Sequence, residues 1–205
     1  MSGKATITYL TLEGGVLVID GNARINNLIL DGGKILVTKS SSALLPSMKL
    51  ENVTISNHGS IVYMGDVKMT SGGSTIINED PDSQMDWGSS ALSIAGNSTF
   101  INNGTAAIGL LRIESKNAKV ILGPNSFLNL INLISNHDNR IAVPTGSANL
   151  SQAGFAQLPK SLTDSPRLII CPGAVSEQRA LSNIVGGYGK ANVMAKGCKS
   201  SSNAH

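Results

Sequence analysis

Short apolar runs separated by Gly, Asn or Asp recur along the first two-thirds of the chain. The clearest pair is LTLEGG at residues 10–15 and LILDGG at residues 28–33, which lie 18 residues apart. The apolar runs that follow them, at 17–19 and 35–37, keep the same register. Self-similarity at a fixed period is the mark of a repeat architecture in which successive units stack. The pattern therefore predicts a stacked fold.

Each unit reads as an alternating strand, a turn and a second strand. Period-2 alternation places Leu28 and Leu30 on one face of a strand and Ile29 on the other. Gly and Asn suit the turns because they tolerate positive φ. Later units are less regular; their first strands and turns are expected at 53–59, 67–73, 92–97, 111–117 and 133–138, and their second strands at 61–63, 75–77, 99–101, 120–122 and 141–143.

The constant phase of these units distinguishes between two all-β architectures. An antiparallel barrel or sandwich shows similar strand spacing, but its hairpins need not keep one phase from unit to unit. A parallel β-helix must keep it, because equivalent residues of successive coils stack. We therefore expect an all-β, right-handed parallel β-helix (β-solenoid) over residues 1–143.

The repeat pattern lapses after residue 143. Residues 144–205 are rich in Pro, Ser, Gln and Ala and then in Gly, Lys and Ser, with one further strand expected at 167–171 and a short helix at 176–185. An open solenoid end exposes strand edges that must be covered. We therefore expect residues 144–205 to form an irregular C-terminal capping or assembly region with a loose tail.

Composition agrees with many short strands and tight turns. Aromatic residues are only 3% and charged residues only 14%, so Val, Ile and Leu must build the core and long charged helical faces are not expected. The 16 Lys and Arg are scattered, which gives nucleic-acid binding little support. No stretch is long enough to span a membrane, and the N-terminus lacks the apolar core of a signal peptide. The chain is expected to be an excised piece or to reach its site without the secretory route, as in virion assembly.

Two stretches interrupt the repeat, at residues 40–46 and 78–88. Insertions in solenoids form loops that often carry the binding face. The second stretch is the most acidic in the chain and contains the only Trp. Trp87 is expected to offer an apolar plate to a sugar ring or a partner chain, unless it folds back over the solenoid above a solvated loop. The carboxylates expected to accept hydrogen bonds from the ligand are Glu79, Asp80, Asp82 and Asp86.

This acidic stretch is not expected to hold a metal ion. Its spacing is faintly similar to a calcium loop, but the glycine that such a loop requires is replaced by Met85. Cys171 and Cys198 lack partner ligands at a zinc-site spacing. These two cysteines either form a disulfide in an oxidising compartment or stay as reduced, buried thiols. No cofactor is expected.

Candidate catalytic groups are few. Glu13 and Asp31 share one repeat position, so in a β-helix they stack one coil apart, about 4.8 Å along the sheet. Paired carboxylates at such short range are what glycoside hydrolysis uses, although both residues also suit a turn before Gly-Gly. His58 and His137 occupy turn positions and His205 is terminal, so repeat chemistry explains them better than catalysis. We assign no catalytic residue.

An ice-binding ladder is not expected either. Such a ladder would repeat Thr-x-Thr on many coils, and the pattern is present only at residues 6–8.

The unit at residues 28–37 and its echoes resemble the coils of β-helical surface proteins, notably the passengers of bacterial autotransporter adhesins and the tailspikes of bacteriophages. The resemblance covers about residues 5–143 and rests on the repeat pattern alone, with no family-specific motif. It implies an extracellular, cell-surface or virion location and contact with a surface polysaccharide or a host-cell receptor. A homotrimer is one assembly that it suggests.

The function expected from the sequence is a non-catalytic adhesion or receptor-binding β-helix module that recognises a cell-surface glycan or protein. The loop at 78–88 is its expected binding site. One alternative is a fragment of a polysaccharide-degrading phage tailspike, acting as a glycoside hydrolase or polysaccharide lyase. Another is a structural scaffold that polymerises end to end, as the bactofilins do.

Overall fold

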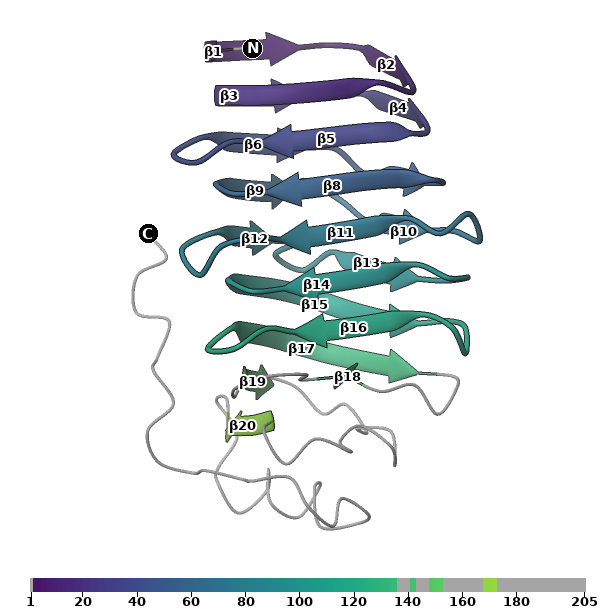
Figure 1. Ribbon diagram of the computed structural model, residues 1–205, viewed down its shortest axis with the longest axis vertical. Helices are drawn as coiled ribbons and strands as arrows, with labels where there is room; N and C mark the ends of the chain where they lie inside the picture. Colours follow the sequence, from purple (N-terminus) through teal and green to yellow (C-terminus); the bar gives the residue numbers. More distant parts are fainter. Residues whose placement is uncertain (1, 136–140, 143–147, 153–167, 173–205) are drawn as a thin grey trace.

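The computed structural model describes residues 2–135, 141–142, 148–152 and 168–172, and these form a β-solenoid of parallel strands (Figure 1). The expected all-β solenoid is therefore confirmed. In Figure 1 the nearer strands run from right to left, and the chain returns behind them while it descends the stack, so the coil is right-handed. No helix in the described part of the chain is long and apolar enough to cross a membrane.

Each coil has three strands, which build three sides of the solenoid. Side 1 contains β1 (Ser2–Ile7), the second half of β3 (Val16–Ile25), β6 (Ser42–Leu45), β9 (Ser60–Tyr63), β12 (Gln84–Asp86), the first halves of β15 (Thr105–Ile113) and β17 (Phe127–Ser135), β19 (Ala148–Gln152) and β20 (Leu168–Pro172). Side 2 contains β2 (Leu10–Glu13), β4 (Leu28–Asp31), β7 (Met48–Leu50), β10 (Val67–Met69), β13 (Ala91–Ile94) and the second halves of β15 and β17. Side 3 contains the first half of β3, β5 (Gly33–Val37), β8 (Val53–Asn57), β11 (Thr75–Asn78), β14 (Thr99–Asn102), β16 (Lys119–Leu122) and β18 (Ile141–Ala142).

The core lies inside the coils because most strands alternate buried and outward residues. On side 3 the pattern is inward at the second residue of β11, β14 and β16 and outward at the first and third. Inward side chains of the same type stack from coil to coil, as Ile35, Ile55 and Ile76 do. All three are fully buried. Burying an aliphatic side chain of this size contributes roughly 1.5–3 kcal/mol relative to leaving it exposed, so these stacks are the main stabilising element.

The first two repeats pair as the sequence predicts. Leu10 pairs with Leu28 and Glu13 with Asp31 in parallel register. The glycine pairs that follow both adopt positive φ, and a Cβ on Gly33 would lie 2.8 Å from the carbonyl carbon of Gly14. Glycine is thus required both by the backbone conformation and by the close approach of the two coils.

The predicted unit contains the strands of sides 2 and 3 but misses side 1. The stretches at 40–46 and 78–88 were expected to interrupt the repeat, yet they contain β6 and β12, which pair in line with β9. The unit expected at 53–63 is also out of phase, because its two strands are β8 on side 3 and β9 on side 1. β12 has three residues and its outward residues Gln84 and Asp86 are polar, so it lacks the apolar run by which other strands are recognised.

Strands also continue past residue 143. β19 pairs with β17 and β20 with β19, both in parallel, so they extend side 1. The strand expected at 167–171 is confirmed as β20. The division of the chain at 143 stays a prediction. The expected helix at 176–185 and Cys198, one half of the candidate disulfide, lie outside the described residues.

Candidate functional site

The acidic stretch between β11 and β12 forms a compact turn rather than a projecting loop. The Ser83 amide donates to the Asp80 carbonyl oxygen (3.0 Å), and the Ser83 hydroxyl donates to the same oxygen (2.6 Å). The Asp80 amide donates in turn to Ser83 Oγ (3.2 Å). Ser83 is fully buried, so its hydrogen bonds to Asp80 anchor the turn to the interior of the solenoid.

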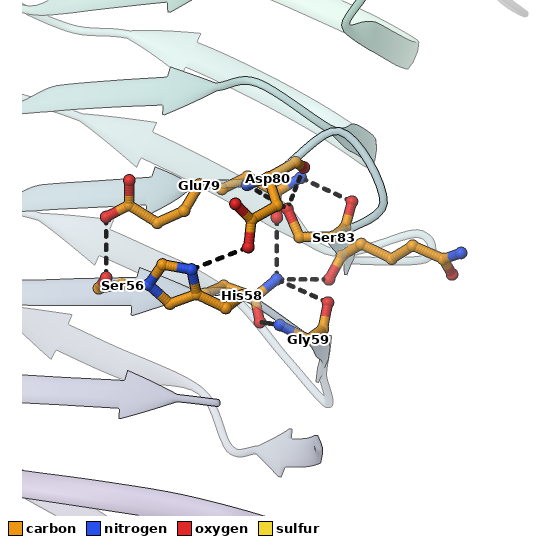
Figure 2. Close-up of polar contacts among 9 residues, drawn as sticks. Ser56, His58, Gly59, Glu79, Asp80 and Ser83 are labelled. Atoms are coloured by element: carbon orange, nitrogen blue, oxygen red, sulfur yellow. Dashed lines mark hydrogen bonds and ion pairs between the residues drawn. The ribbon is translucent and has the colours of Figure 1, made fainter. Parts of the chain in front are cut away.

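Two of the predicted ligand-binding carboxylates bind the preceding coil instead (Figure 2). The Ser56 hydroxyl donates to Glu79 Oε1 at 2.8 Å. His58 Nδ1 lies 2.9 Å from Asp80 Oδ2. The His58–Asp80 contact is partly exposed, so it contributes about 1 kcal/mol at most. The two contacts hold the corner between sides 3 and 1 together across two coils.

His58 and Asp80 are close enough to act as a general acid–base pair, but the hydroxyl group near them is not placed to act as a nucleophile. The hydroxyl nearest in sequence, that of Ser56, is buried to 1% exposure and donates to Glu79. A nucleophile must be reachable and must contact its base. The described groups at this corner therefore do not form a nucleophilic constellation.

Trp87 points into the solenoid. Its side chain is 1% exposed, stacks on Tyr63 with ring centroids 4.2 Å apart, and meets the edge of Phe100 at 5.8 Å. The expected role of Trp87 as a surface plate for a sugar is thus wrong for this structure. The reason is strand parity: Met85 is buried and Asp86 is outward, so the residue after Asp86 faces inward. The alternative, that Trp87 folds back over the solenoid, is also inexact, because its ring lies within the core.

The remaining acidic residues of the stretch are exposed. Asp82 lies on the turn, and Asp86 Oδ1 accepts a hydrogen bond from the Gly88 amide at 2.6 Å. The structure therefore separates the five predicted residues: two bind the neighbouring coil, one is in the core and two face outward. Ligand binding by Asp82 and Asp86 stays a prediction.

The aromatic stack leaves two buried polar atoms without a hydrogen-bond partner, Tyr63 Oη and Trp87 Nε1. Burial raises the pKa of the Tyr63 hydroxyl far above its usual range. A buried donor without a partner costs about 1–3 kcal/mol, because it has lost its hydrogen bonds to water. Two polar atoms of this aromatic stack are therefore buried without a hydrogen-bond partner in an apolar environment.

We expect Tyr63→Phe to raise the free energy of unfolding by about 1 kcal/mol at pH 7, because it removes the hydroxyl and keeps the ring. In the wild type, unfolding exposes a tyrosine that ionises above its ordinary pKa near 10, while the folded form stays protonated. The unfolded state then binds fewer protons, so wild-type stability should fall by about 1.4 kcal/mol per pH unit above pH 10 through this group. The variant should lose that component. Urea denaturation at pH 7 and pH 11 measures both effects, and a variant less stable than wild type at pH 7 would contradict the prediction.

A ladder of buried asparagines lies beside this stack, at the ends of three side 3 strands. Asn57 Nδ2 donates to Asn78 Oδ1 (2.8 Å), and Asn78 Nδ2 donates to Asn102 Oδ1 (2.9 Å). All three amides also donate to backbone carbonyls of the next turn or coil. Sequence analysis missed this ladder. The signal was present, since each asparagine ends an apolar strand just before a turn.

The outward surface of side 3 carries similar residues in register on successive strands. Thr54, Thr75 and Thr99 are in direct register on β8, β11 and β14. Two residues further along the strands an apolar column runs parallel to them. We name the two columns together the Thr–Ile face; its residues are Thr54, Thr75, Thr99, Ile77, Ile101 and Ile121.

The side chains of the Thr–Ile face are partly exposed, and their inward neighbours Ile55, Ile76 and Phe100 are buried. The sequence search for a Thr-x-Thr ladder could not find this face, because no strand supplies more than one threonine to it; β11 and β14 each supply one threonine and one isoleucine. Aligning the strands by their buried residues, as in TII at 75–77 and TFI at 99–101, would have revealed it.

The remaining candidate sites are a pair of carboxylates and any cluster of metal-binding side chains. Glu13 and Asp31 pair as predicted and both are exposed, but a role in catalysis stays a prediction. Within the described residues, no group of three or more His, Cys, Asp or Glu side chains is placed to hold a metal ion.

A comparison of the chain with protein-family models, with curated proteins and with solved structures found no match.

Proposed function

We propose that the chain is a non-catalytic adhesion or receptor-binding module that holds a cell-surface glycan or protein against the Thr–Ile face. The proposal places it in an extracellular, cell-surface or virion setting. The observation that carries it is the continuous, in-register column of threonines beside a column of isoleucines on side 3.

The chemistry of this face suits binding rather than solvation alone. Threonine hydroxyls both donate and accept hydrogen bonds, while the isoleucine column offers apolar contact. Binding sites combine these features, an apolar surface with a few polar groups in defined positions. Parallel strands hold successive hydroxyls about 4.8 Å apart, so an extended ligand along the solenoid axis meets a regular array.

Rigidity supports the same conclusion. The face lies on strands whose inward residues are fully buried and whose ends are fixed by the asparagine ladder. A surface already ordered before binding loses little conformational entropy when the ligand arrives. The 78–88 turn is a weaker candidate, because Glu79 and Asp80 are engaged within the protein.

The test is binding of the labelled chain to a panel of immobilised glycans and to intact cell surfaces. Ile101→Asp places a charge in the centre of the face, and we expect it to weaken binding at least tenfold. Ile29→Asp is the matched control, since Ile29 is 63% exposed on side 2 and should tolerate the change without loss of binding. Both variants must keep the wild-type far-UV circular dichroism spectrum.

Two outcomes would overturn the proposal. Equal binding by Ile101→Asp and wild type would remove the face as the binding site. Release of reducing sugar from a bound polysaccharide would show catalysis, and would direct attention to the adjacent exposed carboxylates Glu13 and Asp31.

A further inference from the structure

A lysine flanks the three threonines at each end, and beyond Lys34 the same register continues to the exposed Val16 on β3. Lys34 on β5 pairs with Thr54, and Lys119 on β16 pairs with Thr99. The column therefore reads Lys34, Thr54, Thr75, Thr99, Lys119, with one residue from each of five successive coils. At about 4.8 Å per strand, the Cα atoms of the two lysines lie roughly 19 Å apart.

No carboxylate lies beside this column on the described outward surface of side 3. The outward positions of β8, β11 and β14 carry no carboxylate. At one corner of the side, Asp20 accepts from Thr38 and Glu79 accepts from Ser56. At the other corner, Glu51 lies 3.6 Å from Lys49; Asp31 and Glu114 lie along the same edge. The two ion pairs found among the described residues involve neither lysine of the column.

We propose that this column binds an acidic linear saccharide that lies along the solenoid axis. The lysines contact its carboxylate or sulfate groups near the two ends, and the threonine hydroxyls bond the sugar hydroxyls between them. The inference rests on the proposed function and adds to it the charge and the direction of the ligand. The flexible lysine stems let each ammonium group reach along the chain while the stem lies on the sheet.

The spacing of the charges favours a saccharide over a nucleic acid. A nucleic-acid strand carries one phosphate about every 3.4 Å, so two cations over roughly 19 Å would leave most phosphates without a partner. Proteins that bind single strands also stack bases on aromatic side chains. On side 3 the described aromatic residue, Phe100, is fully buried.

The test uses uronic-acid oligosaccharides of increasing length and neutral glucans of matched length, titrated into the full chain by calorimetry. For oligosaccharides long enough to span the column, Lys34→Gln and Lys119→Gln should each weaken binding about fivefold, and the double variant about 25-fold. Each loss corresponds to about 1 kcal/mol, as expected for an exposed charge pair. The wild-type affinity should fall as salt is raised, because exposed charges are screened.

Lys68→Gln is the control, because Lys68 is an exposed cation on side 2 and should not affect binding. For oligosaccharides shorter than the column, each single variant should bind almost as tightly as wild type, because a short chain can still use the other lysine, and only the double variant should show the full loss.

The outcomes separate this inference from the proposed function. If the lysine variants bind like wild type while Ile101→Asp does not, the face stands and the acidic ligand is wrong. If Ile101→Asp also binds like wild type, both proposals fail. If single-stranded nucleic acid competes with the oligosaccharide at the same site with higher affinity, the ligand class is overturned.

Discussion

Asn78→Ala is expected to lower the free energy of unfolding by about 3–4 kcal/mol. Asn78 is fully buried and bonds to Asn57 on one side and Asn102 on the other. Its Nδ2 also donates to the Ser83 and Thr105 carbonyl oxygens, at 3.1 and 3.0 Å. Removing the amide leaves Asn102 Oδ1 and part of the Asn57 amide without partners in the interior, and each such group costs about 1–3 kcal/mol. Urea denaturation followed by circular dichroism measures the loss.

Asn97→Ala is the control for this prediction. Asn97 is exposed in the turn between β13 and β14, and its replacement should change stability by less than about 0.5 kcal/mol. A loss of similar size in the two variants would mean that the buried ladder contributes no more than a surface turn. Such a result would contradict the prediction.

Trp87→Ala should also be strongly destabilising, by about 3–5 kcal/mol. The indole fills the centre of the core between Tyr63 and Phe100, so its removal leaves a large cavity between two coils. Large-to-small changes at such sites lose both the transfer free energy of the ring and the packing around it. Because Trp87 is the only Trp in the chain, circular dichroism is the appropriate probe for the variant.

Trp87→Phe tests how much of the loss in Trp87→Ala is due to the cavity. It keeps an aromatic ring on Tyr63 and removes the buried indole N–H, which has no partner. We expect it to cost less than half as much as Trp87→Ala. If Trp87→Ala were neutral for stability but abolished ligand binding, the side chain would be at the surface in solution, as the sequence analysis expected.

Both predictions bear on the binding face. The asparagine ladder includes residues of β11 and β14, and the aromatic stack reaches β14 through Phe100; the opposite surfaces of these two strands carry Thr75 and Thr99. Interactions that hold inward residues in register also hold the outward column in register, because the two alternate along one strand. Variants that loosen the ladder should therefore be compared with wild type in binding assays only where they remain fully folded.

Much of the architecture could be predicted from local features. The Gly-Gly turns at 14–15 and 32–33 and the alternation of Leu28, Ile29 and Leu30 depend on backbone conformation and strand parity. Both are properties of a few consecutive residues, so a single chain displays them. The in-register pair Glu13 and Asp31 followed from the same repeat. These features were sufficient to identify the parallel β-solenoid.

What the sequence by itself determined is thus the fold class, the phase of sides 2 and 3 and the in-register pairs of the first two coils. Only the tertiary structure decided the third side, the inward direction of Trp87 and the single column that contains Thr54, Thr75 and Thr99. The physical reason is coil length. Paired residues lie 18 positions apart between Ser42 and Ser60 but 24 apart between Ser60 and Gln84, so turns of unequal length hide which residues stack. Stacking is set by contacts between coils, and those contacts exist only once the chain has folded.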